Sequence, residues 1–324
     1  MVPKRERSSH LDNGRRVVPQ PAPDLAQGGG MEVLCACDER YLPHLATMLC
    51  SLLLNNTVFR VHFFYSSLDN RELLRLQSFV HNYGSSMVCY EINTVDLPDL
   101  RVDQWVSIAT YYRLLAPRIL PVDVDKILYL DSDIIVRRSL TELWKSDLSD
   151  HALAAVENEG DAVEKAVGWR PVGTRYFNAG VLLINLEFWR QNSVSERAIT
   201  FIRNNPEKVT YWDQDALNAI LVDRWIELPA CWNSQGIGKD PAIVHFTGGE
   251  KPWHWSLEHP FKSEYHKYRL KTPWPQYKLE GKPGLPHILY ACLRGFVRFL
   301  RSFVRTMLPA SLRQWLRFLA SSRT

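Results

Sequence analysis

The chain has 324 residues, of which 46% are hydrophobic and 23% are charged. This composition is ordinary for a folded protein with a substantial core, and it excludes a collagen, a coiled coil and a mostly disordered chain. The net charge of +4 is unevenly distributed. Residues 287–324 contain seven arginines and no acidic residue, and the first thirty residues carry five basic and three acidic side chains, so the residues between them sum to −5.

The first thirty residues are polar, rich in proline and glycine, and lack the pattern of a signal peptide. We interpret 1–30 as a disordered leader, with Met31 as an alternative start. The six cysteines have no metal-binding spacing, which favours a reduced, cytoplasmic protein. The charge-free stretch 41–59 contains Pro43 and helically spaced apolar residues, so we expect a helix packed on a sheet there and no membrane span.

Apolar, β-rich runs alternate with helical patterns along the chain. Strands are predicted at Glu32–Cys37, Arg60–Tyr65, Met87–Ile92, Lys126–Leu130, Ala152–Val156 and Gly180–Asn185. Helices are predicted at Tyr41–Leu54, Asn70–Tyr83, Ile108–Leu120 with an interruption at Pro117, Glu187–Asn204 and Asp213–Val222. The alternation predicts an α/β fold with a largely parallel sheet flanked by helices, in which ligands gather beyond the carboxyl ends of strands. A Rossmann dehydrogenase is excluded because no glycine motif follows the first strand.

Two carboxylates, Asp131 and Asp133, interrupt a strongly apolar run, where unpaired charges would be costly. With period-two spacing, both can point the same way and hold one hard divalent cation, although a turn or a helix cap is the structural alternative. Downstream, His245 ends another apolar run and is followed by a glycine turn that carries Lys251. The histidine alone would be a hydrogen-bonded structural residue, but beside the two carboxylates it completes a site that Mn²⁺ tolerates.

Four motifs follow one another along the chain: Tyr129-Leu-Asp131-Ser-Asp133, Tyr176-Phe-Asn178-Ala-Gly180, Trp212-Asp213-Gln214-Asp215 and His245-Phe-Thr-Gly248-x-x-Lys251. Together they resemble glycosyltransferase family 8, and most closely the bacterial lipopolysaccharide and lipooligosaccharide galactosyl- and glucosyltransferases. The resemblance covers roughly residues 31–253. It implies a GT-A catalytic domain over 31–270, with a mostly parallel mixed sheet flanked by helices. It also implies a UDP-hexose donor, retention of the α configuration, and Mn²⁺ or Mg²⁺ as the cofactor.

The same resemblance implies residue roles. The metal ligands would be Asp131, Asp133 and His245, and the catalytic residues that line the sugar would be Asn178, Asp213 and Gln214. The donor contacts would be Ala36, Asp38, Tyr41, Arg113, Gly248 and Lys251. The chain departs from the pattern at Arg40 and Asn158, where related galactosyltransferases often carry Asn and Asp. The sugar and the acceptor are therefore left open.

The chemistry of the residues agrees with these roles. Breaking a sugar–diphosphate bond requires stabilisation of the charge that builds on the departing UDP, and a divalent cation with Lys251 can provide it electrostatically. Retention requires either a covalent carboxylate intermediate or attack from the leaving-group face. Asp213 is the nearest candidate carboxylate, and the sequence leaves both routes open.

Residues 271–324 form a basic tail in which Arg294, Arg298, Arg301 and Arg305 share one helical stripe opposite an apolar face. We interpret this tail as amphipathic helices on an anionic membrane surface; the alternative is a solvated helix packed on the protein body. No nucleic-acid partner is expected. The sequence thus predicts a hexosyltransferase that extends a glycolipid or oligosaccharide acceptor, such as the lipopolysaccharide core, on the inner face of the plasma membrane. The alternatives are a catalytically inactive UDP-sugar-binding or membrane scaffold of the same fold, and a nucleotidyltransferase.

Overall fold

The computed structural model describes residues 30–93, 97, 100, 107–158, 174–236, 238–276 and 280–281. Two compact units divide the chain: residues 1–252 with 257–278, and residues 253–256 with 279–324. In the second unit, two backbone hydrogen bonds join the described segments 253–256 and 280–281. Trp255 N–H donates to Glu280 O at 2.8 Å, and Glu280 N–H donates to Trp253 O at 2.9 Å. The expected leader and most of the basic tail lie outside the described residues.

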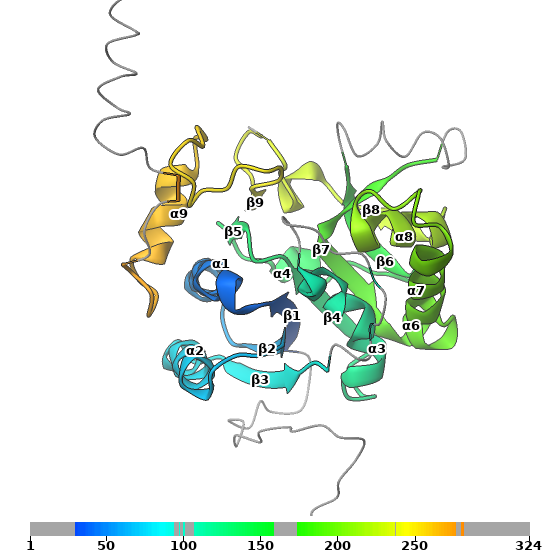
Figure 1. The fold of residues 1–324 in the computed structure, drawn as a ribbon, viewed down its shortest axis with the longest axis horizontal. Coiled ribbons are helices and arrows are strands. Elements are labelled where there is room, and N and C mark those ends of the chain that lie inside the picture. Colours follow the sequence, from blue (N-terminus) through cyan, green and yellow to red (C-terminus); the bar gives the residue numbers. More distant parts are fainter. Residues whose placement is uncertain are drawn as a thin grey trace, which may run out of the picture. The chain divides into compact units, whose positions relative to one another are not determined.

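A seven-stranded mixed sheet forms the centre of the first unit (Figure 1). Its strands, in spatial order, are β3 (Ser86–Glu91), β2 (Phe59–Tyr65), β1 (Met31–Cys37), β4 (Lys126–Leu130), β7 (Phe177–Asn185), β6 (Leu153–Glu157) and β8 (Trp225–Glu227). The pairs from β3 to β4 and the pair β6–β8 are parallel, whereas β7 is antiparallel to both of its neighbours. A separate antiparallel pair consists of β5 (Ile134–Val136) and β9 (Ile243–His245).

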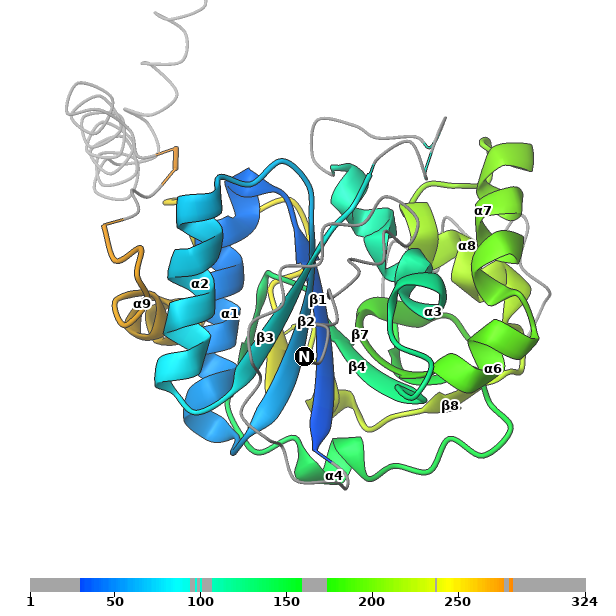
Figure 2. The same cartoon turned by 90° about the horizontal axis from the view of Figure 1, so that it is seen from below.

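Helices cover both faces of the sheet (Figure 2). One face carries α1 (Leu42–Asn55) and α2 (Asn70–Asn82), and the other carries α3 (Ala116–Ile119), α6 (Leu186–Gln191), α7 (Val194–Asn204) and α8 (Trp212–Ile220). Alternate residues of β1 enter the two resulting cores, with Val33 and Cys35 on the α1 side and Leu34 and Ala36 on the other. The remaining helices are α4 (Thr141–Trp144), α9 (Lys262–Arg269) and the 3₁₀ helices η1 (Glu39–Tyr41), η3 (Ile108–Leu115) and η4 (Ala230–Trp232).

The α/β class and the mixed, mostly parallel sheet confirm the sequence prediction, and three local details differ. Residues 108–115 form a 3₁₀ helix, and Pro117 lies in the first turn of α3 instead of interrupting a helix. A proline is tolerated there because the first-turn N–H groups have no partner within the helix. The helix predicted at Glu187–Asn204 is broken into α6 and α7, because Ser193 adopts a left-handed conformation with φ of 47°. The strand predicted from Gly180 begins earlier, at Phe177.

Most of the stretch 41–59 forms α1, over Leu42–Asn55, and its buried leucines pack on the sheet, as the sequence predicts. Among the described residues, no helix is long and apolar enough to cross a membrane.

Strand pairing brings several chain segments to one edge of the sheet. The carboxyl ends of β1 and β4 lie together because these strands are parallel, with Leu34 paired to Tyr129. The amino end of β7 joins them because β7 is antiparallel to β4, and Asp131 N–H donates to Gly180 O at 2.9 Å. The pairing of β5 with β9 places Ile134 opposite His245. Residues far apart in the sequence therefore meet at this edge.

Candidate active site

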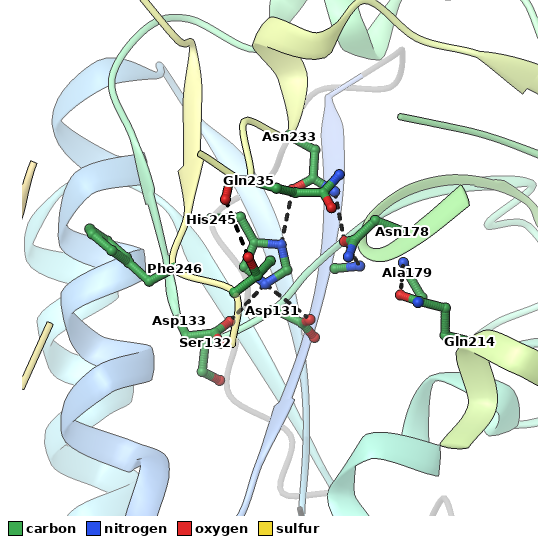
Figure 3. A network of polar contacts seen from close by, with 12 residues as sticks. Asp131, Ser132, Asp133, Asn178, Ala179, Gln214, Asn233, Gln235, His245 and Phe246 are labelled. Carbon is green, nitrogen blue, oxygen red and sulfur yellow. Dashed lines mark hydrogen bonds and ion pairs between the residues drawn. The ribbon is translucent and has the colours of Figure 1, made fainter. Parts of the chain in front are cut away.

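The first feature of this edge is a cluster of Asp131, Asp133 and His245, one ligand atom of each lying within 4.8 Å of the others (Figure 3). His245 Nε2 lies 3.2 Å from Asp133 Oδ1 and 3.8 Å from Asp131 Oδ2. Two carboxylate oxygens and one imidazole nitrogen are a ligand set that fits Mn²⁺ or Mg²⁺, both of which accept oxygen-rich sites and keep open positions for substrate. The residues present therefore fit the cation that the sequence predicts.

The second oxygen of each carboxylate contacts a cation of the protein. Arg113 Nη2 lies 3.1 Å from Asp131 Oδ1, which also accepts a 2.8 Å hydrogen bond from the Tyr129 hydroxyl. Lys251 Nζ lies 2.6 Å from Asp133 Oδ2 and donates to Phe246 O at 2.8 Å. Burial would raise the pKa of Asp133, but Lys251 and His245 hold it below its usual range. Asp133 is thus held ionised, and each carboxylate has one oxygen turned toward His245.

Arg113 links the carboxylate cluster to the start of α8. Its side chain is 4% exposed; its Nε lies 3.1 Å from Asp213 Oδ2, and its Nη1 donates to Ala179 O. Asp213 Oδ1 accepts a 3.1 Å hydrogen bond from the Thr110 hydroxyl. Burial, opposed by Arg113 and aided by the charge of Asp131, raises the pKa of Asp213 to about 6. This carboxyl therefore changes charge close to neutral pH.

A strained turn at Trp212 places Asp213 next to Arg113. Trp212 has φ of 47°, a left-handed conformation that is costly for a bulky side chain. The turn is held by Asp215 Oδ2, which accepts hydrogen bonds of 2.6 Å from the backbone N–H groups of Thr210 and Tyr211. Asp215 Oδ1 in turn accepts a 2.6 Å bond from the Tyr176 hydroxyl. Strain held in place by several hydrogen bonds is typical of functional sites.

Gln214 and Asn178 are committed to contacts within the protein. Gln214 Oε1 accepts a 2.9 Å hydrogen bond from Ala179 N–H, and its Nε2 donates to the Tyr176 hydroxyl at 3.2 Å (Figure 3 shows the first contact). Asn178 is 7% exposed, and its Oδ1 accepts hydrogen bonds from Gly180 N–H at 2.9 Å and from Asn233 Nδ2 at 2.8 Å. Both side chains therefore hold the backbone of β7 at the site, Gln214 at Ala179 and Asn178 at Gly180.

The end of β1 borders the same cluster. Ser132 Oγ donates to Ala36 O at 3.3 Å, which joins the carboxylate loop to the segment expected to contact uridine. Asp38 caps η1 by accepting a 3.1 Å hydrogen bond from Tyr41 N–H, and it pairs with Arg40 at 3.3 Å. Tyr41 itself precedes α1. The departure from the family pattern at Arg40 thus adds a cation beside Asp38.

Comparison with known proteins shows the family and the fold. Residues 32–256 match the family model described as glycosyl transferase family 8. The chain belongs to this family. It is 32% identical over 273 residues to general stress protein A of Bacillus subtilis, an alignment that covers 75% of this chain and 94% of that protein. It is 27% identical over 282 residues to lipopolysaccharide 1,3-galactosyltransferase of Salmonella typhimurium, covering 80% and 83% of the two chains.

Among solved structures, this family 8 glycosyltransferase resembles the galactosyltransferase LgtC, crystallised with donor and acceptor sugar analogues. The TM-score is 0.68 at 25% identity, and the match covers 75% of this chain and 96% of LgtC. The fold is therefore of the GT-A type.

The structure places all the expected metal ligands and expected sugar residues at one edge, together with Arg113 and Lys251. Gly248 lies in the turn after β9 with φ of 87°, where glycine is favoured. Sequence reasoning gave no role to Asn233, which lies between η4 and β9 and whose Oδ1 is 2.9 Å from His245 Nδ1. Neither periodicity nor a motif marks Asn233 in the sequence, because its contact with His245 arises only from the pairing of its segment with β9.

Proposed function

We propose that this family 8 glycosyltransferase transfers a hexose, galactose or glucose, from a UDP-hexose to a saccharide acceptor with retention of the α configuration. The proposal rests on one cluster at the sheet edge. Asp131, Asp133 and His245 lie together there, and the two carboxylates pair with the cations Arg113 and Lys251. The similarity to lipopolysaccharide glycosyltransferases supports the lipopolysaccharide core as the acceptor. Mn²⁺ is the proposed cofactor, with Mg²⁺ as the alternative.

Each part of the site has an assignment in this proposal. A divalent cation held by Asp131, Asp133 and His245 would supply positive charge for the departing diphosphate. Lys251, whose Nζ lies 2.6 Å from Asp133, is placed to add a second positive charge, and Gly248 allows close approach of its backbone. We assign the uridine contacts to Ala36 in β1 and to Asp38 and Tyr41, which follow the end of that strand.

We assign Asp213 to the sugar and not to nucleophilic attack. Its carboxylate is 3% exposed, is ion-paired with Arg113 and accepts a hydrogen bond from Thr110. A carboxylate in these contacts is poorly placed to form a bond to the anomeric carbon, and we assign its remaining lone pairs to a hydrogen bond from a sugar hydroxyl. The proposed retaining route is therefore attack from the leaving-group face. Asn178 and Gln214 support this side of the site through their contacts with Gly180 and Ala179.

The experiment that tests the function measures UDP release from UDP-galactose and UDP-glucose with Mn²⁺, with and without lipooligosaccharide acceptor. We expect release from one donor, dependent on the cation and accelerated by the acceptor. A separate assay with UTP and hexose 1-phosphate tests the alternative, because release of pyrophosphate from UTP would instead identify a nucleotidyltransferase. UDP binding without release from either donor would support the alternative of a catalytically inactive UDP-sugar-binding scaffold.

The raised pKa of Asp213 predicts a pH dependence of donor binding. The carboxyl is ionised above about pH 6 and gains a proton below it, so its charge-assisted hydrogen bond to the sugar weakens as the pH falls. At pH 5 only about a tenth of the carboxyl is ionised, and we expect the affinity for UDP-hexose to fall about tenfold between pH 7 and pH 5. Free UDP is the control, because it lacks the sugar. The expectation is wrong if UDP and UDP-hexose affinities change in parallel, or if Asp213→Asn keeps the difference.

The basic tail supports a second proposal, that the protein acts as a peripheral protein on the cytoplasmic face of the plasma membrane. Seven arginines without an acidic residue in 287–324 would attract anionic lipid. We expect deletion of 287–324 to reduce co-sedimentation with phosphatidylglycerol vesicles by about tenfold or more, since each arginine near such a surface contributes on the order of 1 kcal/mol. UDP affinity should be preserved. Equal sedimentation of the two proteins would contradict the proposal; phosphatidylcholine vesicles measure the charge-independent background.

A further inference from the structure

Buried asparagines lie in line behind the ring of His245. Asn233 Oδ1 is 2.9 Å from His245 Nδ1, and Asn233 Nδ2 is 2.8 Å from Asn178 Oδ1 (Figure 3). Asn178 Nδ2 continues the line to Asn158 Oδ1 at 2.9 Å. The three asparagines are between 1% and 7% exposed. Because water has little access to them, the hydrogen bonds between these side chains decide how each amide is oriented.

The direction of this line of hydrogen bonds is determined at one backbone amide. Gly180 N–H can only donate, and it lies 2.9 Å from Asn178 Oδ1, so the oxygen of Asn178 must stand there. That oxygen requires a donor from Asn233, which turns the NH₂ group of Asn233 toward Asn178 and its oxygen toward His245. An amide oxygen only accepts hydrogen bonds, so the ring nitrogen that faces it, Nδ1, must carry a proton.

We propose that Asn178 and Asn233 are positioning residues that hold His245 in the tautomer protonated on Nδ1, so that Nε2 presents its lone pair to a divalent cation. The proposal rests on the proposed function, because it deepens the role of the same metal site. Nε2 is the nitrogen that faces the carboxylates, at 3.2 Å from Asp133 and 3.8 Å from Asp131. In the other tautomer Nε2 would carry the hydrogen and could not bind the cation.

This assignment changes the role expected for Asn178. The resemblance implies that its side chain lines the sugar, but its oxygen already accepts two hydrogen bonds and its NH₂ group already donates to Asn158. An amide that makes these three hydrogen bonds acts mainly by orienting the groups that it binds. Asn178 therefore acts on the reaction through His245 and through the backbone at Gly180, which carries the carbonyl bonded to Asp131 N–H.

The first test measures Mn²⁺ affinity, without donor or acceptor, by the electron paramagnetic resonance of free Mn²⁺. We expect Asn233→Ala to weaken binding about 10- to 100-fold, the usual effect of removing the partner of a metal-bound histidine. Gln235→Ala is the matched control, because Gln235 lies in the same loop and its NH₂ group donates to Glu157 O instead. Its affinity should remain within about twofold of wild type. Equal affinities of Asn233→Ala and wild type would overturn the proposal.

A pair of substitutions at Asn178 separates orientation from packing. Asn178→Asp keeps an oxygen for Gly180 N–H and Asn233, so we expect Mn²⁺ affinity within about threefold of wild type. Asn178→Leu is similar in size but lacks the acceptor that orients Asn233, and we expect a loss of about tenfold or more. If the two variants bind Mn²⁺ equally, Asn178 does not act through His245 and the proposal is wrong.

The tautomer itself can be measured in the wild-type protein, so the proposal does not depend on how any variant folds. With Mg²⁺, which is diamagnetic, ¹⁵N spectra of His245 should show a protonated Nδ1 and an unprotonated Nε2. A protonated Nε2 in the Mg²⁺ form would overturn the proposal. His245→Ala distinguishes the two levels of inference: if it binds Mn²⁺ as tightly as wild type, the metal site and the proposed function fail together, whereas weak binding with an unaffected Asn233→Ala defeats the tautomer proposal alone.

Discussion

Asp133→Asn should lower Mn²⁺-dependent UDP release by about 10²- to 10³-fold. The substitution removes one of the two carboxylates of the cluster and leaves Lys251 without the partner that lies 2.6 Å away. A cation of this kind contributes several kcal/mol of charge stabilisation in the transition state, and each 1.36 kcal/mol corresponds to a tenfold change in rate. The measurement is the initial rate of UDP release over a series of Mn²⁺ concentrations, so that weaker metal binding and a slower reaction can be separated.

Asp125→Asn is the matched control for this experiment. Asp125 is exposed and directly precedes β4, whereas Asp131 and Asp133 follow the other end of that strand, about 17 Å or more away by strand geometry. The control should leave the rate and the Mn²⁺ dependence unchanged. An Asp133→Asn variant that retains wild-type rates at all Mn²⁺ concentrations would remove Asp133 from the metal site.

Gly180→Ala should disrupt the metal site from the side of the sheet. A Cβ atom at Gly180 would lie 2.2 Å from His245 Cε1, 2.7 Å from His245 Nδ1 and 2.8 Å from Asp131 Oδ2. His245 is buried and held by Asn233, so the ring cannot move aside without losing its hydrogen bond. Overpacking of this kind costs about 1–3 kcal/mol of unfolding free energy. We expect a melting temperature lower by about 3 °C or more and Mn²⁺ binding weakened by about tenfold or more.

Gly236→Ala tests whether the effect is specific to Gly180. An added Cβ at Gly236 would meet no atom within 4 Å, so the melting temperature and Mn²⁺ affinity should stay at wild-type values. The prediction for Gly180 fails if its alanine variant binds Mn²⁺ like the control. A variant that unfolds at a lower temperature but binds Mn²⁺ normally would show that the site adapts to the extra methyl group.

Much of the framework was predictable from local pattern. Apolar runs with β-rich composition marked β1, β2, β3 and β4, and helical spacing marked α1, α2 and α8, because the periodicity of burial is written directly into the residues of one element. Asp131 and Asp133 stood out because charges are rare within an apolar run. The break between α6 and α7 was missed, since Ser193 adopts φ of 47° in a segment whose composition still favours a helix.

The sequence by itself determined the fold class, the family and the residues with chemistry suited to a cation and a diphosphate, because those properties depend on residue type and on short-range spacing. Tertiary structure decided which of these residues meet and in what state. Burial raises the pKa of Asp213 against the lowering effect of Arg113. The pairing of β5 with β9 brings His245 to the carboxylates, and Asn233 contacts its ring. Hydrogen-bond partners and charge states at this site depend on distances between segments that are separated in the sequence, from 12 residues for Asn233 and His245 to 118 for Asp133 and Lys251, which local pattern does not encode.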